Sequence, residues 1–91
     1  MKEGAEKRGT KIIAISHYAP TLIELQKMVG GYIEILALDK TTQMIVDEEG
    51  LLKDKPCNQI ATGIARKSES LYDGIIIVGD VVILSGDALV K

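Results

Sequence analysis

Three polar residues, Asn58, Thr62 and Arg66, recur at intervals of four in a stretch whose apolar pattern predicts a helix. This spacing places the three side chains in one line along a single helix face. A helix N-terminus at one end of the line and a guanidinium at the other could hold a phosphate or a carboxylate. In the structural alternative, Asn58 caps the helix and the rest of the line faces water. The line is the candidate ligand-binding site, for a small molecule or a nucleotide.

A second group of residues is acidic: Asp47, Glu48 and Glu49 are consecutive, and Glu34 would lie across a predicted hairpin from them. Several carboxylate oxygens near one turn can bind a divalent cation or serve as acid and base. Their spacing matches no cation-binding loop, however, and a strand end that faces water is the alternative. We expect no metal site, and a hydrolase that uses this acidic turn is the last of three functional hypotheses.

The only histidine, His17, and the only cysteine, Cys57, each lack a partner at a recognisable catalytic spacing. We expect His17 in a surface turn. A helix dipole could stabilise a thiolate at Cys57, but we favour a small, partly buried side chain without chemistry. Gly30-Gly31 lacks the further glycines and the lysine of a phosphate-binding loop. The sequence thus predicts no catalytic residue, no cofactor and no enzyme.

The composition limits the classes of protein that this chain can represent. Its 91 residues suffice for one domain, and 46% apolar with 26% charged residues is typical of a globular domain. The formal net charge of -2 argues against a nucleic-acid partner, because such proteins usually carry a basic stripe. The longest apolar runs, 75–78 and 81–84, are far shorter than a membrane span of about twenty residues. We therefore expect neither nucleic acid nor a membrane as a partner.

The beginning of the chain is polar and contains glycines, so residues 1–10 are predicted to form a disordered tail and residues 11–91 a single domain. A single cysteine excludes an internal disulfide, and no signal-peptide pattern opens the sequence. These two features together predict a cytoplasmic location.

The first half of the domain contains a strand, a helix and a hairpin. Residues 11–16 suit a strand, and Thr21 and Glu24 have the spacing of a capping box that starts a helix. Gly30 should end this helix in the left-handed conformation. Residues 32–38 and 42–47 then form an antiparallel hairpin, because the connection between them is short.

The hairpin's second strand should have one face that is more exposed to solvent, formed by Gln43, Ile45 and Asp47. Downstream, the second helix begins after Asn58. Residues 74–84 are predicted to form two short strands separated by a break at Gly79-Asp80. This break is either a two-residue turn or a bulge.

These elements predict an α+β fold. We expect an antiparallel or mixed sheet of four or five strands, in the order β-α-β-β-α-β-β, with both helices on one face. The other face would then be partly exposed. The first hairpin strand carries a surplus of apolar residues, which would leave surface for a homodimer through a sheet edge or face. These residues are Ile33, Ile35, Leu36 and Leu38.

Five short motifs occur in order along the chain. They are Glu24-Leu25-Gln26, Val29 to Glu34, Val46 to Gly50, Asn58 to Thr62 and Val78 to Val81. With them the chain resembles a family of small domains of unknown function found mainly in bacteriophages, plasmids and other mobile elements. The family usually has Asn where this chain has Asp47, which places in doubt any role that needs an amide donor there.

The resemblance implies no catalytic residues and gives only a biological context. Small proteins of such elements often bind a host protein, sequester a small molecule or modulate defence, so a host or phage protein is one expected partner. Our leading hypothesis is a non-enzymatic interaction or regulatory module of mobile-element origin. It predicts an exposed apolar or edge-strand surface and no deep pocket. The alternative is a protein that binds and sequesters a small molecule or nucleotide through the polar line of the second helix.

Overall fold

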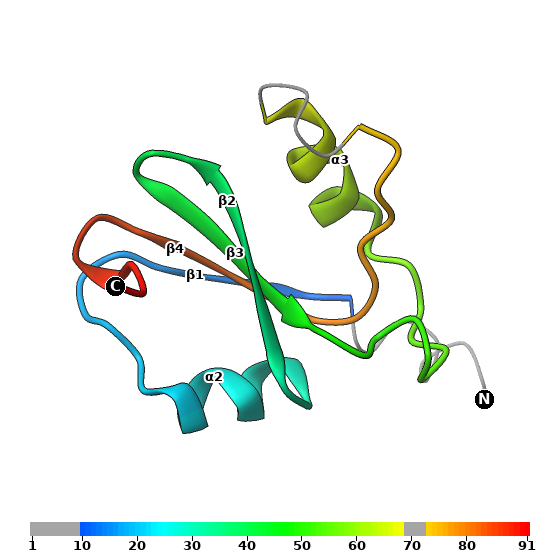
Figure 1. Cartoon of the computed structure of the whole chain (residues 1–91), viewed down its shortest axis with the longest axis horizontal. Coiled ribbons are helices and arrows are strands. Elements are labelled where there is room, and N and C mark those ends of the chain that lie inside the picture. The colour runs from blue at the N-terminus through cyan, green and yellow to red at the C-terminus, as the bar shows by residue number, and fades with distance from the viewer. Residues whose placement is uncertain (1–9, 69–72) are drawn as a thin grey trace.

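The computed structural model describes residues 10–68 and 73–91 of the chain. Its elements are β1 (Ile12–Ile15), α2 (Leu22–Val29), β2 (Ile33–Asp39), β3 (Thr42–Asp47), α3 (Gln59–Lys67), β4 (Val81–Ser85) and the short 3-10 helix η1 (Gly86–Ala88). The four strands form one sheet in the order β1-β4-β3-β2, in which β1 is parallel to β4 and the other neighbours are antiparallel (Figure 1). The α+β fold with a mixed sheet is confirmed. The predicted tail lies outside the described residues except for Thr10.

Helix α2 begins and ends where its capping residues predict. The Glu24 N–H donates to Thr21 Oγ1 at 3.1 Å, and the Thr21 N–H donates to Glu24 Oε1 at 2.8 Å. Gly30 has a φ of 87° and its N–H donates to the Gln26 carbonyl. Only glycine adopts such a φ without steric cost, so the chain can turn directly from α2 into β2.

The two helices lie on opposite faces of the sheet, and the prediction that both cover one face is wrong (Figure 1). Leu25 of α2 packs in one cluster with Ile45, whereas Ala61 of α3 belongs to another cluster with Met44 and Val46. Neighbouring residues of a strand point to opposite faces. Because β3 is apolar at three consecutive positions, both faces of the sheet need a cover.

The prediction that one face of β3 is more exposed to solvent is wrong for the same reason. Ile45 is fully buried and Asp47 is 6% exposed. Gln43 is half-buried, and its side-chain amide exchanges two hydrogen bonds with the backbone of Val90 in the C-terminal segment. The α2 face is therefore covered by a helix and by the end of the chain.

Of the two strands predicted for residues 74–84, only the second is present in the sheet. Residues 74–77 lie outside the sheet, and Val78 forms an isolated bridge with Cys57. Gly79, with a φ of 77°, separates this bridge from β4, so Gly79-Asp80 neither turns a hairpin nor bulges a long strand. Across the described residues, no helix is long and apolar enough to cross a membrane.

Gly63 in α3 has free space around it: a Cβ built there would meet nothing within 4 Å. Since alanine favours a helix by up to about 1 kcal/mol relative to glycine, we expect Gly63→Ala to raise the urea midpoint of unfolding. Gly79→Ala is the control. Its Cβ would lie 2.8 Å from Lys55 Cδ at a positive φ, so this substitution should lower the midpoint. A lower midpoint for Gly63→Ala would contradict the inference that a side chain at this position meets no neighbour.

Candidate functional site

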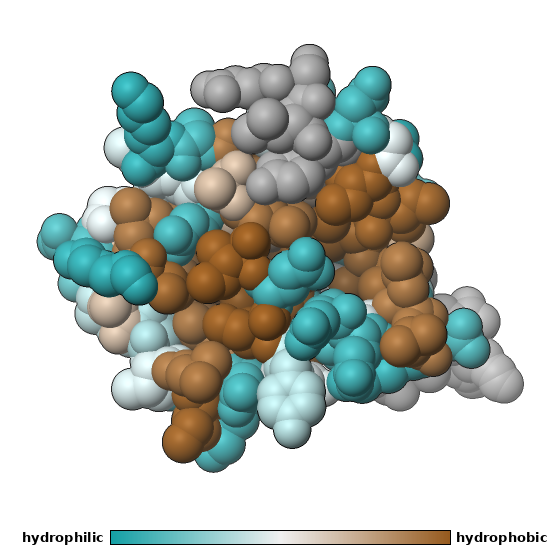
Figure 2. All heavy atoms as spheres, viewed as in Figure 1, coloured by the Kyte–Doolittle hydropathy of each residue, from teal (hydrophilic) through white to brown (hydrophobic). Residues whose placement is uncertain are grey.

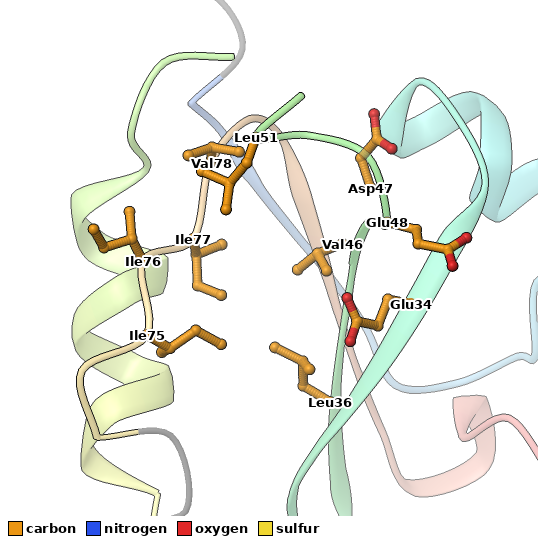
Figure 3. A pocket seen from close by; sticks show the side chains of 10 residues that line it. All are labelled: Glu34, Leu36, Val46, Asp47, Glu48, Leu51, Ile75, Ile76, Ile77 and Val78. Carbon is orange, nitrogen blue, oxygen red and sulfur yellow. The ribbon is translucent and has the colours of Figure 1, made fainter. Parts of the chain in front are cut away.

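A groove opens on the α3 side of the sheet, between the β2–β3 hairpin and the stretch that leads from α3 to β4. Figure 3 shows Ile75 and Ile77 pointing across it toward Leu36 and Val46, with Leu51 at one end. Its volume is about 140 Å³, whereas pockets for drug-sized ligands measure about 300 to 1,000 Å³. The groove therefore suits one or two inserted side chains better than a whole small molecule.

The groove continues into exposed apolar surface. Leu51 is 68% exposed and Ile76 is 52% exposed, and both line the groove. In the view of Figure 2, apolar atoms gather over the stretch that connects α3 to β4. Contiguous apolar surface of this kind usually marks a site of interaction. Its role toward a partner stays a prediction.

The predicted acidic cluster is divided by the structure. Glu34 and Glu48 are exposed on the groove, and neither carboxylate has an ion-pair partner within residues 10–68 and 73–91. Glu49 is exposed but does not line the groove. Asp47 is buried and turned toward two lysines. The groove thus has an acidic edge made of two carboxylates.

Asp47 holds three parts of the fold together. Its Oδ2 lies 2.9 Å from Lys53 Nζ and 2.6 Å from Lys55 Nζ, and its Oδ1 accepts the Glu49 N–H at 2.8 Å. The same two ammonium groups donate to the carbonyls of Gly30 and Val29 at the end of α2. Cations are favourable at that position because the helix carbonyls there lack helical partners.

These contacts control the ionisation of Asp47. Burial acts to raise the pKa of the Asp47 carboxyl, but hydrogen bonds from Lys55, Lys53 and the Glu49 N–H, together with the charge of Lys55, lower it from 3.8 to about 2. Asp47 is consequently an ionised structural anchor at neutral pH.

The predicted polar line of α3 contacts the chain's own backbone. Asn58 is 1% exposed; its Oδ1 accepts the Ala61 N–H, and its Nδ2 donates to the Gly79 carbonyl at 2.9 Å. The Thr62 hydroxyl accepts the Ile77 N–H at 2.9 Å and donates to the Asn58 carbonyl at 2.8 Å.

Arg66 completes this line, because its Nε donates to the Ile75 carbonyl at 2.8 Å. All three predicted side chains therefore lie together, as the spacing implies, and each binds the stretch from Ile75 to Gly79. Their role toward a ligand stays a prediction. A shallow hollow of about 400 Å³ lies beside Thr62, Gly63 and Arg66.

The groove residues 75–78 were missed as a site by sequence reasoning. Their signal was present in four consecutive β-branched residues, which we interpreted only as a strand. What placed them in a site is their position opposite the hairpin, which the order of residues does not reveal.

The two remaining candidate residues, His17 and Cys57, are at the surface. His17 is exposed and lies edge-on to Tyr18, with ring centroids 5.3 Å apart, as expected of a surface turn. Cys57 is exposed and free, so the expectation of a partly buried thiol is wrong. Over the part of the chain that the structure describes, no three residues among His, Cys, Asp and Glu are arranged to hold a metal ion.

A family model described as Domain of unknown function (DUF3846) matches residues 5–88, and the chain belongs to this family. No curated protein and no solved structure matches the chain. The expected membership of a small family of unknown function is thereby confirmed.

Asp47 should give the protein a distinct acid sensitivity. Because its folded pKa of about 2 lies below the ordinary 3.8, its stabilising effect is complete above that ordinary value and is lost as the pH falls to about 2. Asp47→Asn should cost roughly 1 to 3 kcal/mol near neutral pH. Urea unfolding at several pH values should show a steeper acid loss of stability for the wild type than for the variant. Equal losses would contradict the ion-pair role.

Proposed function

We propose that this domain is a non-enzymatic interaction module whose groove receives a segment of a partner protein. The observation that carries the proposal is the continuous apolar surface around the groove, where Leu51 and Ile76 are more than half exposed. Burying such surface against a partner is favourable by about 25 cal/mol per Å² of apolar area. A charged edge beside an apolar centre is the usual composition of a protein interface.

The state of the acidic turn supports a binding role over catalysis. A general acid at neutral pH needs a raised pKa, whereas the pKa of Asp47 is lowered to about 2. Its carboxylate is also occupied by Lys53 and Lys55. This carboxylate therefore serves the fold and is not free to act in hydrolysis.

The biological setting is part of the same proposal. The ordered motifs from Glu24 to Val81 resemble those of domains from phages, plasmids and other mobile elements. The partner would then be a host or phage protein in the cytoplasm.

Two neighbouring leucines provide a matched test. Leu51 is 68% exposed and lines the groove, whereas Leu52 is 85% exposed and does not line it. In affinity capture from the native host with mass spectrometry, we expect a protein that the wild type and Leu52→Asp retain and Leu51→Asp loses. Circular dichroism should show all three folded. Capture of the same proteins by Leu51→Asp, or recovery of only a small molecule, would contradict the proposal.

A second candidate function is the binding of a small anion in the hollow beside α3. The observation that favours it is the presence there of Thr62 and of Arg66, whose terminal guanidinium nitrogens make no hydrogen bond to the described residues. A guanidinium of this kind can bind a phosphate or carboxylate in bidentate fashion.

Inorganic phosphate, adenosine triphosphate and citrate are suitable probes for this second function. If the hollow binds anions, at least one probe should raise the melting temperature of the wild type, and Arg66→Ala should abolish the shift. Lys67→Ala is the control, because Lys67 is a neighbouring exposed cation that does not line the hollow. An unchanged shift in Arg66→Ala would exclude the hollow as the anion site.

A further inference from the structure

Strand β1 forms one open edge of the sheet (Figure 1). Among the described strands, it pairs with β4 alone. The Val81 N–H donates to the Lys11 carbonyl at 3.1 Å, and alternate residues of a strand direct their backbone groups to opposite sides. Ile12 and Ala14 therefore direct theirs away from β4. Neither makes a backbone hydrogen bond outside the β1–β4 ladder to any residue in the ranges 10–68 and 73–91.

The two edges of the sheet differ in how they are protected. Edge strands usually carry charges, prolines or bulges that prevent pairing with another chain. The other edge strand, β2, has a register irregularity between Ala37 and Asp39 and carries the carboxylates of Glu34 and Asp39. Strand β1 has the sequence Ile-Ile-Ala-Ile and pairs evenly with β4. Its Ile13 is only half-buried and its Ala14 is exposed, so β1 is the unprotected edge.

Opposite charges lie at the two ends of the β1 edge. Lys11 precedes β1 and is exposed, and the nearby Asp80 carboxylate already accepts the Lys11 N–H. At the other end, a Cβ built on Gly86 would lie 3.4 Å from the Ser16 carbonyl oxygen, and the next residue, Asp87, is exposed. Neither the Lys11 ammonium nor the Asp87 carboxylate makes an ion pair within the described residues.

We propose that the β1 edge is the interface of a homodimer, in which β1 pairs antiparallel with β1 of a second copy and the two sheets become one. Antiparallel pairing brings Lys11 of each copy to the end that carries Asp87 of the other, whereas parallel pairing would bring like charges together. The chain itself thus supplies the complement of this edge, which favours a second copy as the occupant. A two-fold arrangement of this kind closes after two copies.

The free backbone groups select the register of the pair. With Ala14 on the two-fold axis, Ala14 lies opposite Ala14 of the second copy and Ile12 lies opposite Ser16, so their outward N–H and C=O groups can bond to each other. The small Ala14 side chains allow the two strands to approach. On the α2 face, Ile13 would lie opposite Ile15 of the second copy, which covers the apolar surface that Ile13 exposes in the monomer.

The dimer goes beyond the proposed groove function and does not depend on it. Leu36 and Val46 line the groove from β2 and β3, and β4 separates these strands from β1. The homodimer that the sequence leads us to expect is therefore assigned to β1 instead of β2.

Sedimentation equilibrium of the full 91-residue chain provides the test. We expect a dimer in the wild type. Ala14→Lys should raise the dissociation constant at least about tenfold, because two lysines would then face each other across the axis. Ala37→Lys is the control, since Ala37 is the exposed alanine of the other edge strand, and this variant should keep the dimer. Circular dichroism should show all three proteins folded.

Charge reversal tests the orientation without a change in the strand. Lys11→Glu and Asp87→Lys should each weaken the dimer at least about fivefold, and the double variant should restore it, because the two opposite charges then exchange places. Glu49→Lys makes the same change of charge at an exposed position far along the chain from β1 and should leave the dimer intact. Failure of the double variant to restore the dimer would overturn the antiparallel arrangement.

Amide hydrogen exchange of nitrogen-15-labelled protein locates the interface. We expect exchange at Ile12 and Ala14 to be at least about tenfold slower in the wild type than in Asp87→Lys. A wild type that is monomeric at about 1 mM would overturn the inference. So would a dimer that protects Ile35 of β2 or Ile76 instead.

Leu51→Asp distinguishes this inference from the proposed function. The variant should remain a dimer, because Leu51 lines the groove. If it remains a dimer but captures the same proteins as the wild type, the proposed function fails and the dimer stands. If Leu51→Asp dissociates the dimer, the interface lies at the groove and the inference about β1 is overturned.

Discussion

The backbone of Ile77 is held by Thr62 and Asn58 instead of by a neighbouring strand, and the α3 side of the molecule depends on this arrangement. A buried amide or carbonyl without a partner costs about 1 to 3 kcal/mol. Asn58 satisfies several such groups at once, since it caps α3 and donates to the Gly79 carbonyl. Helix α3 is thereby fixed to the stretch that precedes β4, and the two form one unit.

The groove is a consequence of that unit. The stretch from Ile75 to Gly79 is bonded to α3, and although Ile77 packs in one buried cluster with Leu36 and Val46, a groove remains open between this stretch and the hairpin. The α2 face is covered by α2 and by the C-terminal segment bound by Gln43, and a hollow of about 220 Å³ lies between these two, lined by Leu25, Ile33 and Leu89 among others.

Asp47 shows how a cluster that looks chemical can serve the fold. Three consecutive acids suggest a cation site or an acid–base pair, but burial of Asp47 against Lys53 and Lys55 assigns it to the junction of α2, β3 and the following loop. The neighbouring Glu48 remains exposed on the groove. Adjacent residues of one type thus separate into an anchor and a surface charge, because successive side chains of a strand end point in opposite directions.

The sequence by itself determined the elements whose signals are local. The capping box at Thr21, the left-handed Gly30, the Asn58 cap and the short hairpin connection all depend on residues within a few positions of one another, and the structure has each of them. The shared α3 face of Asn58, Thr62 and Arg66 was predictable for the same reason.

Only the tertiary structure decided which face each helix covers, what the polar line binds and where the 75–78 residues lie. These outcomes depend on residues far apart in the chain, such as the Asn58 amide and the Gly79 carbonyl, or Asp47 and the end of α2. A run of β-branched residues favours an extended backbone, whether its backbone hydrogen bonds are made to a neighbouring strand or to side chains of a helix. Which of the two becomes the partner is settled by the packing of the whole domain, because both faces of an apolar sheet must be covered.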